Sequence, residues 1–179
     1  GWVAAPALLP GPARVPRTGS APAGGGRRHW WDTLRGEAHV RGTDEALRLE
    51  ILERFTLRPW MLGLVEELRN RRFTVGLLSD QTNWLDELDD RFGFYGRFDY
   101  IFNSFHMGKS KNAPTHFDDV LRLLNRQGRE VLFIDDNAGH VGRAVERGWK
   151  AILFGKQDDF LRELSKQLPP ELPASSIPR

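Results

Sequence analysis

The sequence has no cysteine and no long hydrophobic run, and both absences narrow what the protein can be. Without cysteine, a disulfide framework, a thiolate nucleophile and a cysteine-ligated zinc site are all excluded. No stretch of 18 or more apolar residues occurs, so no transmembrane helix is predicted. The 179 residues are 40% hydrophobic and 28% charged, a balance typical of one globular domain with a hydrophobic core.

Acidic residues and lysine are absent from the first 31 residues, which carry four arginines and therefore a charge of +4. The whole chain has a net charge of +2, so subtracting +4 leaves −2 for the rest. The pI of 9.2 thus reflects this head, and it predicts no nucleic-acid-binding surface on the folded part. Gly, Ala, Pro and Arg fill 21 of the first 28 positions, so we expect residues 1–29 to be disordered.

No convincing targeting signal is found in the head. Its apolar start lacks a preceding basic region and is interrupted by Pro6, which argues against a secretory signal. The first residue is Gly rather than Met, which indicates a fragment or a wrongly framed stretch of coding sequence. The default location is the cytoplasm, with neither a membrane nor a nucleic acid as partner.

Two hydrophobic periodicities alternate along the rest of the chain. Helical spacing predicts helices at or near 44–56, 61–68, 82–92, 117–124, 138–147 and 160–168, and short apolar runs predict strands at 73–78, 100–102, 131–134 and 151–154. This alternation predicts an α/β fold, a Rossmann-like parallel sheet with helices on both faces. Ligands of such sheets bind beyond the carboxyl ends of the strands, where we therefore looked for reactive residues.

Polar residues directly follow the apolar strand 73–78. Ser79 and Asp80 are typical of a helix N-cap, because their side-chain oxygens accept a hydrogen bond from a backbone N–H. A second interpretation is that the hydroxyl and the helix start together hold an anion such as phosphate. The residues themselves leave both interpretations open.

An acidic pair, Asp135-Asp136, ends the buried strand 131–134. Three other Asp-Asp pairs occur within or at the start of predicted helices, where a solvated face or a cap explains them. At a buried strand end, two carboxylates repel each other unless a cation compensates them. Hard oxygen ligands of this kind favour Mg²⁺, so the pair is a candidate magnesium site.

Two of the five lysines lie in the segment 108–117 between a strand and a helix. Its Gly-Lys-Ser matches the end of a phosphate-binding P-loop, but the first glycine of that motif is replaced by Asn103. Either Lys109 or Lys111 could instead present a positive charge to a phosphate. The five histidines show no metal-ligand spacing, and we expect them to be structural or exposed.

In this order the segments resemble the haloacid dehalogenase-like (HAD) hydrolase superfamily, which consists mostly of Mg²⁺-dependent phosphatases. Residues 73–80 (FTVGLLSD) resemble its second motif, an apolar strand ending in Ser or Thr. The glycine, lysine, proline and phenylalanine of 108–117 keep the spacing of its third motif, G-x-x-K-P-D-P-x-x-F, although Asn112 and Ala113 replace the usual Pro-Asp. Residues 131–137 (VLFIDDN) resemble the fourth motif.

The resemblance implies a role for each matched residue. Ser79, with Asp80 beside it, would bind the phosphoryl oxygens of a small phosphorylated substrate, and Lys111 would neutralise their charge. Asp135 and Asp136 would hold Mg²⁺ directly or through water. The resemblance also implies an aspartyl-phosphate intermediate, and hence an Asp nucleophile.

The family's nucleophile belongs to a first motif, D-x-D, which this chain lacks. No acidic residue precedes Asp32, and Asp32 follows no apolar strand, so we do not take it as the nucleophile. We therefore expect the first, central strand of the sheet to be missing and the chain as given to be inactive. The alternatives are a non-catalytic binding module and a hydrolase of carbon–halogen bonds. The expected divisions are a head (1–29), the remnant of a helical cap (30–58), the α/β core (59–168) and a Pro-rich tail (169–179).

Overall fold

The computed structural model describes residues 2–6 and 41–168, which form two compact units. One unit is the sheet with its helices, and the other contains α2 (Asp44–Glu53), whose N-cap Thr43 accepts a hydrogen bond from the N–H of Ala46. Of the expected divisions, most of the head, residues 30–40 of the cap remnant and the tail lie outside the described residues. No helix of the described ranges is long and apolar enough to cross a membrane.

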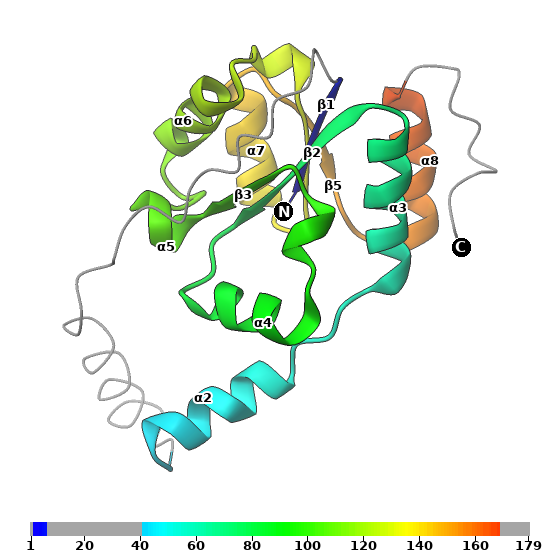
Figure 1. Cartoon of the computed structure of the whole chain (residues 1–179). Helices are drawn as coiled ribbons and strands as arrows, with labels where there is room; N and C mark the ends of the chain where they lie inside the picture. The colour runs from blue at the N-terminus through cyan, green and yellow to red at the C-terminus, as the bar shows by residue number, and fades with distance from the viewer. Residues whose placement is uncertain (1, 7–40, 169–179) are drawn as a thin grey trace. The chain divides into compact units, whose positions relative to one another are not determined.

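Five strands form the sheet in the order β3-β2-β1-β4-β5 (Figure 1). Their bounds are β1 Trp2–Pro6, β2 Phe73–Ser79, β3 Tyr100–Asn103, β4 Leu132–Asp135 and β5 Lys150–Leu153. The β2–β3 and β4–β5 pairs are parallel, as the alternation of strands and helices predicts. All four strands predicted from the sequence are confirmed, with ends that differ by one residue at most.

The central position of the sheet is occupied, contrary to the prediction that its first strand is missing. β1 lies between β2 and β4 and is antiparallel to both. The expected disorder of the head is thus wrong for residues 2–6, while residues 7–29 lie outside the described part. The physical reason is that backbone groups of β2 and β4 need partners in the middle of a sheet. Pro6 is compatible with this position because it pairs at the very end of the ladder with β2 and lies beyond the ladder with β4.

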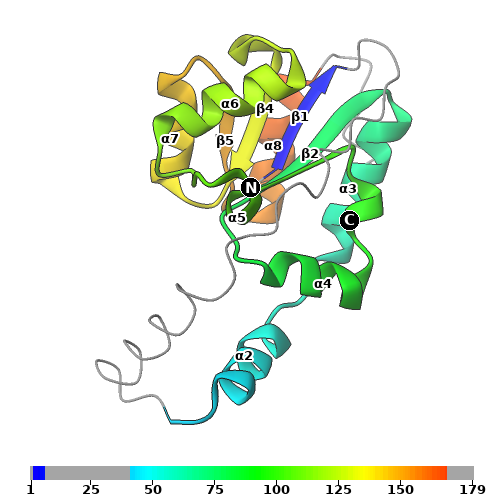
Figure 2. The same ribbon diagram turned by 60° about the vertical axis from the view of Figure 1, so that its left-hand side comes forward.

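Helices cover both faces of the sheet, and each face has its own core (Figure 2). α3 (Pro59–Asn70) and α8 (Gln157–Gln167) pack on one face. α6 (Pro114–Leu124) and α7 (Ala138–Glu146) pack on the other. This arrangement confirms the expected α/β fold with helices on both sides.

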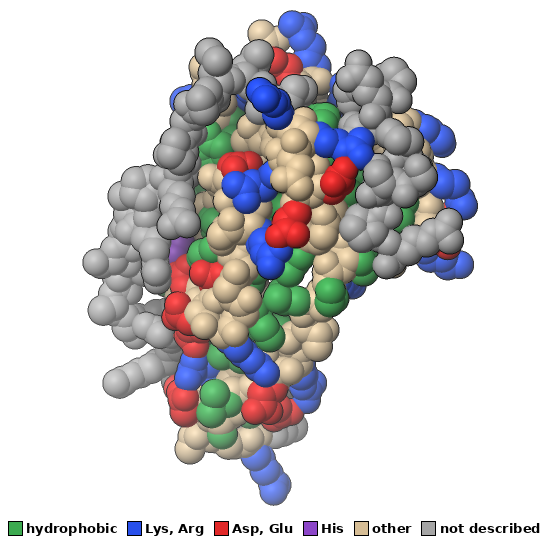
Figure 3. Space-filling view, turned by 45° about the vertical axis from the view of Figure 1, so that its right-hand side comes forward, with side chains coloured by type: hydrophobic (Ala, Val, Ile, Leu, Met, Phe, Trp, Pro, Cys, Tyr) green, Lys and Arg blue, Asp and Glu red, His purple; other side chains and the backbone are tan. Residues whose placement is uncertain are grey.

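The shorter elements connect these layers. α4 (Trp84–Phe92) and α5 (Ser104–Met107) follow β2 and β3, and the 3₁₀ turns η1 (Tyr95–Arg97) and η2 (Gly128–Glu130) precede β3 and β4. α5 and the two 3₁₀ turns were not predicted, because a single turn carries no hydrophobic periodicity. On the face drawn in Figure 3, charged side chains of both signs are interspersed.

Candidate functional site

Strand alternation decides which polar side chains can meet at the carboxyl ends of β2 and β4. Successive side chains of a strand point to opposite faces of the sheet. Phe133 of β4 packs in the core beneath α6 and α7, so Asp135, two residues later, belongs to the same face. Leu78 of β2 also packs in that core, so continuing the alternation places Asp80 on this face. By the same alternation, Ser79 and Asp136 belong to the opposite face of the sheet.

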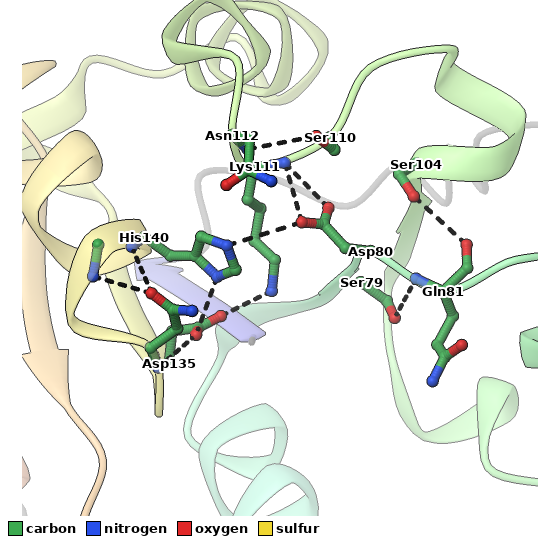
Figure 4. Close-up of polar contacts among 11 residues, drawn as sticks. Ser79, Asp80, Gln81, Ser104, Ser110, Lys111, Asn112, Asp135 and His140 are labelled. Atoms are coloured by element: carbon green, nitrogen blue, oxygen red, sulfur yellow. Dashed lines mark hydrogen bonds and ion pairs between the residues drawn. The ribbon is translucent and has the colours of Figure 1, made fainter. Parts of the chain in front are cut away.

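Lys111 links the two carboxylates of this face. Its Nζ donates to Oδ2 of Asp135 at 2.7 Å, and its backbone N–H donates to both oxygens of Asp80, at 2.9 and 3.1 Å (Figure 4). The side chains of Lys111 and Asp135 are only 6% and 1% exposed. Surface pairs such as Arg54–Glu50 are largely exposed and contribute little to stability, whereas a buried pair couples two charges strongly.

The carboxyl of Asp135 is held in its ionised form. Burial by itself raises the pKa of this group, because it disfavours the charged form. The positive charge of the N-terminus lowers it most, followed by the hydrogen bonds from the Lys111 ammonium and from the backbone N–H of Asn137, and together they hold the pKa of Asp135 well below its usual range. A carboxylate that stays ionised can accept hydrogen bonds or bind a cation.

Ser79 takes part in a different set of hydrogen bonds. Its Oγ accepts the N–H of Gln81 at 3.3 Å, while the Oγ of Ser104 donates to the carbonyl of Gln81 at 3.3 Å. The buried side chain of Asn103 also donates to the carbonyl of Thr82 at 3.0 Å. Asn103 at the end of β3 and Ser104 at the start of α5 thus fix the loop that follows β2, and the hydroxyl of Ser79, the last residue of β2, contacts the same loop.

The structure brings together some of the residues proposed from the sequence and not others. Asp80, Lys111 and Asp135 form one cluster, which we call the strand-end cluster. The Ser79 hydroxyl is turned toward the backbone of Gln81 (Figure 4), and Asp136 is exposed. Lys109 pairs with Asp119 on α6, away from the cluster, so of the two candidate lysines it is Lys111 that reaches the strand ends.

His140 is a fourth member of the strand-end cluster that the sequence analysis missed. Its Nδ1 lies 3.2 Å from Oδ1 of Asp135, and its Nε2 lies 3.8 Å from Oδ2 of Asp80. We looked for histidines at metal-ligand spacing, and His140 has none. The sequence feature that could have identified His140 is its position in the first turn of α7, which directly follows β4 and Asp135. Side chains in that turn lie close to the end of the strand.

The cluster offers Mg²⁺ a suitable but incomplete set of ligands. Asp135 provides an ionised carboxylate, the donor type that Mg²⁺ prefers. Within residues 2–6 and 41–168, no three carboxylate or imidazole side chains are arranged to hold a metal ion together. Mg²⁺ often binds one or two carboxylates and completes its coordination with water and substrate phosphate, so the donor chemistry of Asp135 fits this ion.

Comparison with known proteins adds a family assignment. A family model described as haloacid dehalogenase-like hydrolase matches residues 5–142. Bifunctional epoxide hydrolase 2 of Rattus norvegicus is 30% identical over 128 residues, which are 68% of this chain and 23% of that protein. Flavin mononucleotide hydrolase 1 of Arabidopsis thaliana is 25% identical over 105 residues, 59% of this chain and 43% of that protein. The chain thus spans about a quarter of the length of the epoxide hydrolase.

A solved structure shares the fold. A HAD family enzyme of Bacteroides thetaiotaomicron, crystallised with magnesium and inorganic phosphate, superposes with a TM-score of 0.64 at 19% sequence identity. The match covers 77% of this chain and 72% of that chain.

Proposed function

The chain belongs to the haloacid dehalogenase-like hydrolases, and from this membership we propose that its strand-end cluster binds the phosphate group of a small phosphorylated substrate. In the complete protein, Mg²⁺-dependent hydrolysis of that phosphoester is the activity we propose. Two relatives support the direction of this proposal, a flavin mononucleotide hydrolase and a HAD family enzyme crystallised with magnesium and phosphate. A cytoplasmic location stays a prediction.

The observation that carries the proposal is the buried ion pair of Lys111 and Asp135. An ammonium group has three N–H donors, and Asp135 accepts one of them. A phosphate oxygen beside Lys111 would accept another, and the low dielectric of the buried site strengthens that interaction. Lys111 would thus bind and orient the phosphate, while Asp80 holds the Lys111 backbone in place.

Magnesium is part of the proposal for the complete protein. Asp135 would hold the ion, with Asp136 as the second carboxylate that the family resemblance implies. When bound, Mg²⁺ neutralises charge that develops on the phosphoryl oxygens.

The proposed reaction needs a carboxylate nucleophile at the central strand, and β1 does not provide one. The sequence of β1 is Trp-Val-Ala-Ala-Pro, which contains no acidic residue. We therefore expect the chain to bind phosphate and to leave phosphoesters intact. The same observation favours a second candidate function, a non-catalytic module that binds a phosphorylated ligand.

A titration with inorganic phosphate tests the proposal. We expect the ³¹P resonance of phosphate to shift with added chain, and the Lys111→Met variant to lose this binding. Lys109→Met is the matched control, because Lys109 lies on the same segment but pairs with Asp119. Since Lys111→Met takes the ammonium away from the buried carboxylate of Asp135, the double variant Lys111→Met/Asp135→Asn removes both charges of the pair.

Two results would contradict the proposal. Phosphate binding that survives in the folded double variant would place the ligand elsewhere, and Mg²⁺-dependent hydrolysis of p-nitrophenyl phosphate by the purified chain would disprove the expected inactivity.

A further inference from the structure

The two arginines of α7 and its C-cap differ in what they contact. Arg147, the C-cap, forms an ion pair with Asp118 of α6. Arg143 lies one turn earlier and is partly buried, yet its side chain makes no hydrogen bond or ion pair with any other part of the chain that the structure describes. A guanidinium carries a permanent charge and five N–H donors, so Arg143 is free to bind an anion.

The Arg143 side chain runs back along the helix toward the strand-end cluster. Side chains of a helix tilt toward its N-terminus, and Arg143 follows Gly139 by four residues, so both lie on one face of α7. A Cβ placed at Gly139 would lie 3.4 Å from Nη1 and 3.9 Å from Nη2 of Arg143. The guanidinium therefore lies over the first turn of the helix, where a glycine leaves room for it.

That first turn is directly connected to the strand-end cluster. The side-chain oxygen of Asn137 accepts the N–H of Gly139 at 2.8 Å, and the N–H of Asn137 donates to Oδ1 of Asp135 at 2.8 Å. Lys111 contacts the other oxygen of Asp135, Oδ2, at 2.7 Å. The ammonium and the turn beneath the Arg143 guanidinium thus reach Asp135 at different oxygens, so a ligand that contacts both cations needs two anionic groups.

Helix electrostatics do not explain the position of Arg143. The helix dipole favours cations near the C-terminus of a helix, whereas this guanidinium lies over the first turn. The charges at this edge of the sheet give a better reason. Three carboxylates, of Asp80, Asp135 and Asp136, lie at the ends of β2 and β4, and Lys111 supplies one ammonium against them. A substrate with a second anionic group adds negative charge there, which a second cation offsets.

We infer that Arg143 is a specificity-determining residue beside the strand-end cluster, whose guanidinium binds a second anionic group of the substrate. The inference rests on the phosphate site proposed above, and it narrows the substrate to small phosphorylated compounds that carry a further carboxylate or phosphate. Both of these groups present two oxygens that match the planar fork of a guanidinium, a geometry that a lysine ammonium does not offer.

The experiment uses the full chain, without metal, and two probes, inorganic phosphate and inorganic pyrophosphate, with affinities measured by isothermal titration calorimetry. Pyrophosphate provides the second anionic group, so Arg143→Gln should weaken its binding about tenfold more than that of phosphate. Arg143→Lys keeps the charge without the fork and should recover part of this loss. The matched control is Arg129→Gln, which removes the same charge from η2, at the start of β4, and should change neither affinity.

A second measurement needs no variant. In the ¹⁵N-labelled wild-type chain, pyrophosphate should shift the Nε–H resonance of Arg143 more than phosphate does.

Each alternative result is decisive. Equal losses for the two probes in Arg143→Gln, or no loss for either, would overturn the role of Arg143. If phosphate binding depends on Lys111 while the ratio of the two affinities is the same in Arg143→Gln and wild type, the proposed function stands and this inference fails. If the wild-type chain binds neither probe, both fail. An Arg143 resonance that saturating pyrophosphate leaves in place overturns the inference even if Arg143→Gln does not fold.

Discussion

A buried histidine in α6 illustrates how a single side chain can limit stability. His116 is fully buried, and neither of its ring nitrogens has a hydrogen-bond partner among the described residues. Burial lowers the pKa of His116 most strongly, while Asp80 and Asp119 raise it and Lys109 and Lys111 lower it, with a net shift downward. The folded protein therefore holds this imidazole neutral, whereas the unfolded chain takes up a proton near pH 6.5.

This difference predicts a pH dependence of stability. Because the unfolded state binds more protons, the free energy of unfolding decreases as pH falls below about 6.5, down to the lower pKa of the folded state. We expect the wild-type chain to lose about 1 kcal/mol more than His116→Leu between pH 7.5 and pH 5.5. Urea denaturation at both pH values measures the difference, and equal losses in the two proteins would contradict the assignment.

At the scale of elements, the most consequential feature is the antiparallel strand in the centre of the sheet. Every backbone N–H and C=O of a central strand faces a neighbouring strand. Ala4 of β1 pairs with Val75 of β2 and with Leu132 of β4, so it lies where both ladders are present. Pro6 pairs only with Phe73, at the end of one ladder.

A proline at the middle of β1 should therefore destabilise the sheet. Ala4→Pro removes an N–H between two ladders, and we expect it to lower the free energy of unfolding by about 1–3 kcal/mol. Ala4→Gly is the control, since it keeps the N–H and should cost less than about 1 kcal/mol. Urea denaturation followed by tryptophan fluorescence compares the two, and equal midpoints would mean that β1 does not pair in solution.

Close packing of backbone also joins the start of η2 to the turn after α7. A Cβ added at Gly128 would lie 2.6 Å from the carbonyl oxygen of Gly148 and 2.7 Å from its carbonyl carbon. Both atoms belong to the backbone, so no side chain can move aside to relieve the contact. Gly142, within α7, has no atom within 4 Å of such a Cβ.

Alanine at these two positions should have opposite effects. We expect Gly128→Ala to destabilise the protein by about 1–3 kcal/mol, because overpacked backbone must shift. Gly142→Ala should stabilise it by up to about 1 kcal/mol, because alanine loses less conformational entropy in a helix. Thermal denaturation of both variants measures the signs, and a Gly128→Ala variant as stable as wild type would show that this contact is loose.

At the scale of the whole molecule, the sheet order explains how distant segments form one cluster. Asp80 follows β2, Lys111 precedes α6, and Asp135 and His140 lie on either side of the β4–α7 junction. β2 and β4 are both antiparallel to β1, so their carboxyl ends lie at one edge of the sheet, and α6 and α7 cover the same face there. The cluster therefore forms from segments that are up to 60 residues apart.

Much of this was predictable because it depends on local sequence. The four strands follow from short apolar runs, and the candidate residue Asp135 follows from its place at the end of a buried strand. Such features depend on burial and backbone geometry within a few residues, which hydrophobic periodicity reports directly.

The sequence by itself thus determined the fold class, four of the five strands and the edge of the sheet at which the candidate site residues gather. Only the tertiary structure decided that Asp80 and His140 join Lys111 and Asp135, while the hydroxyl of Ser79 turns to the loop after β2. These contacts depend on which face of the sheet each side chain occupies, on the order of the strands and on where the helices pack. All three are properties of the packed layers. The central β1 was likewise decided by tertiary pairing, because backbone groups of β2 and β4 need partners whatever the local preference of the segment that supplies them.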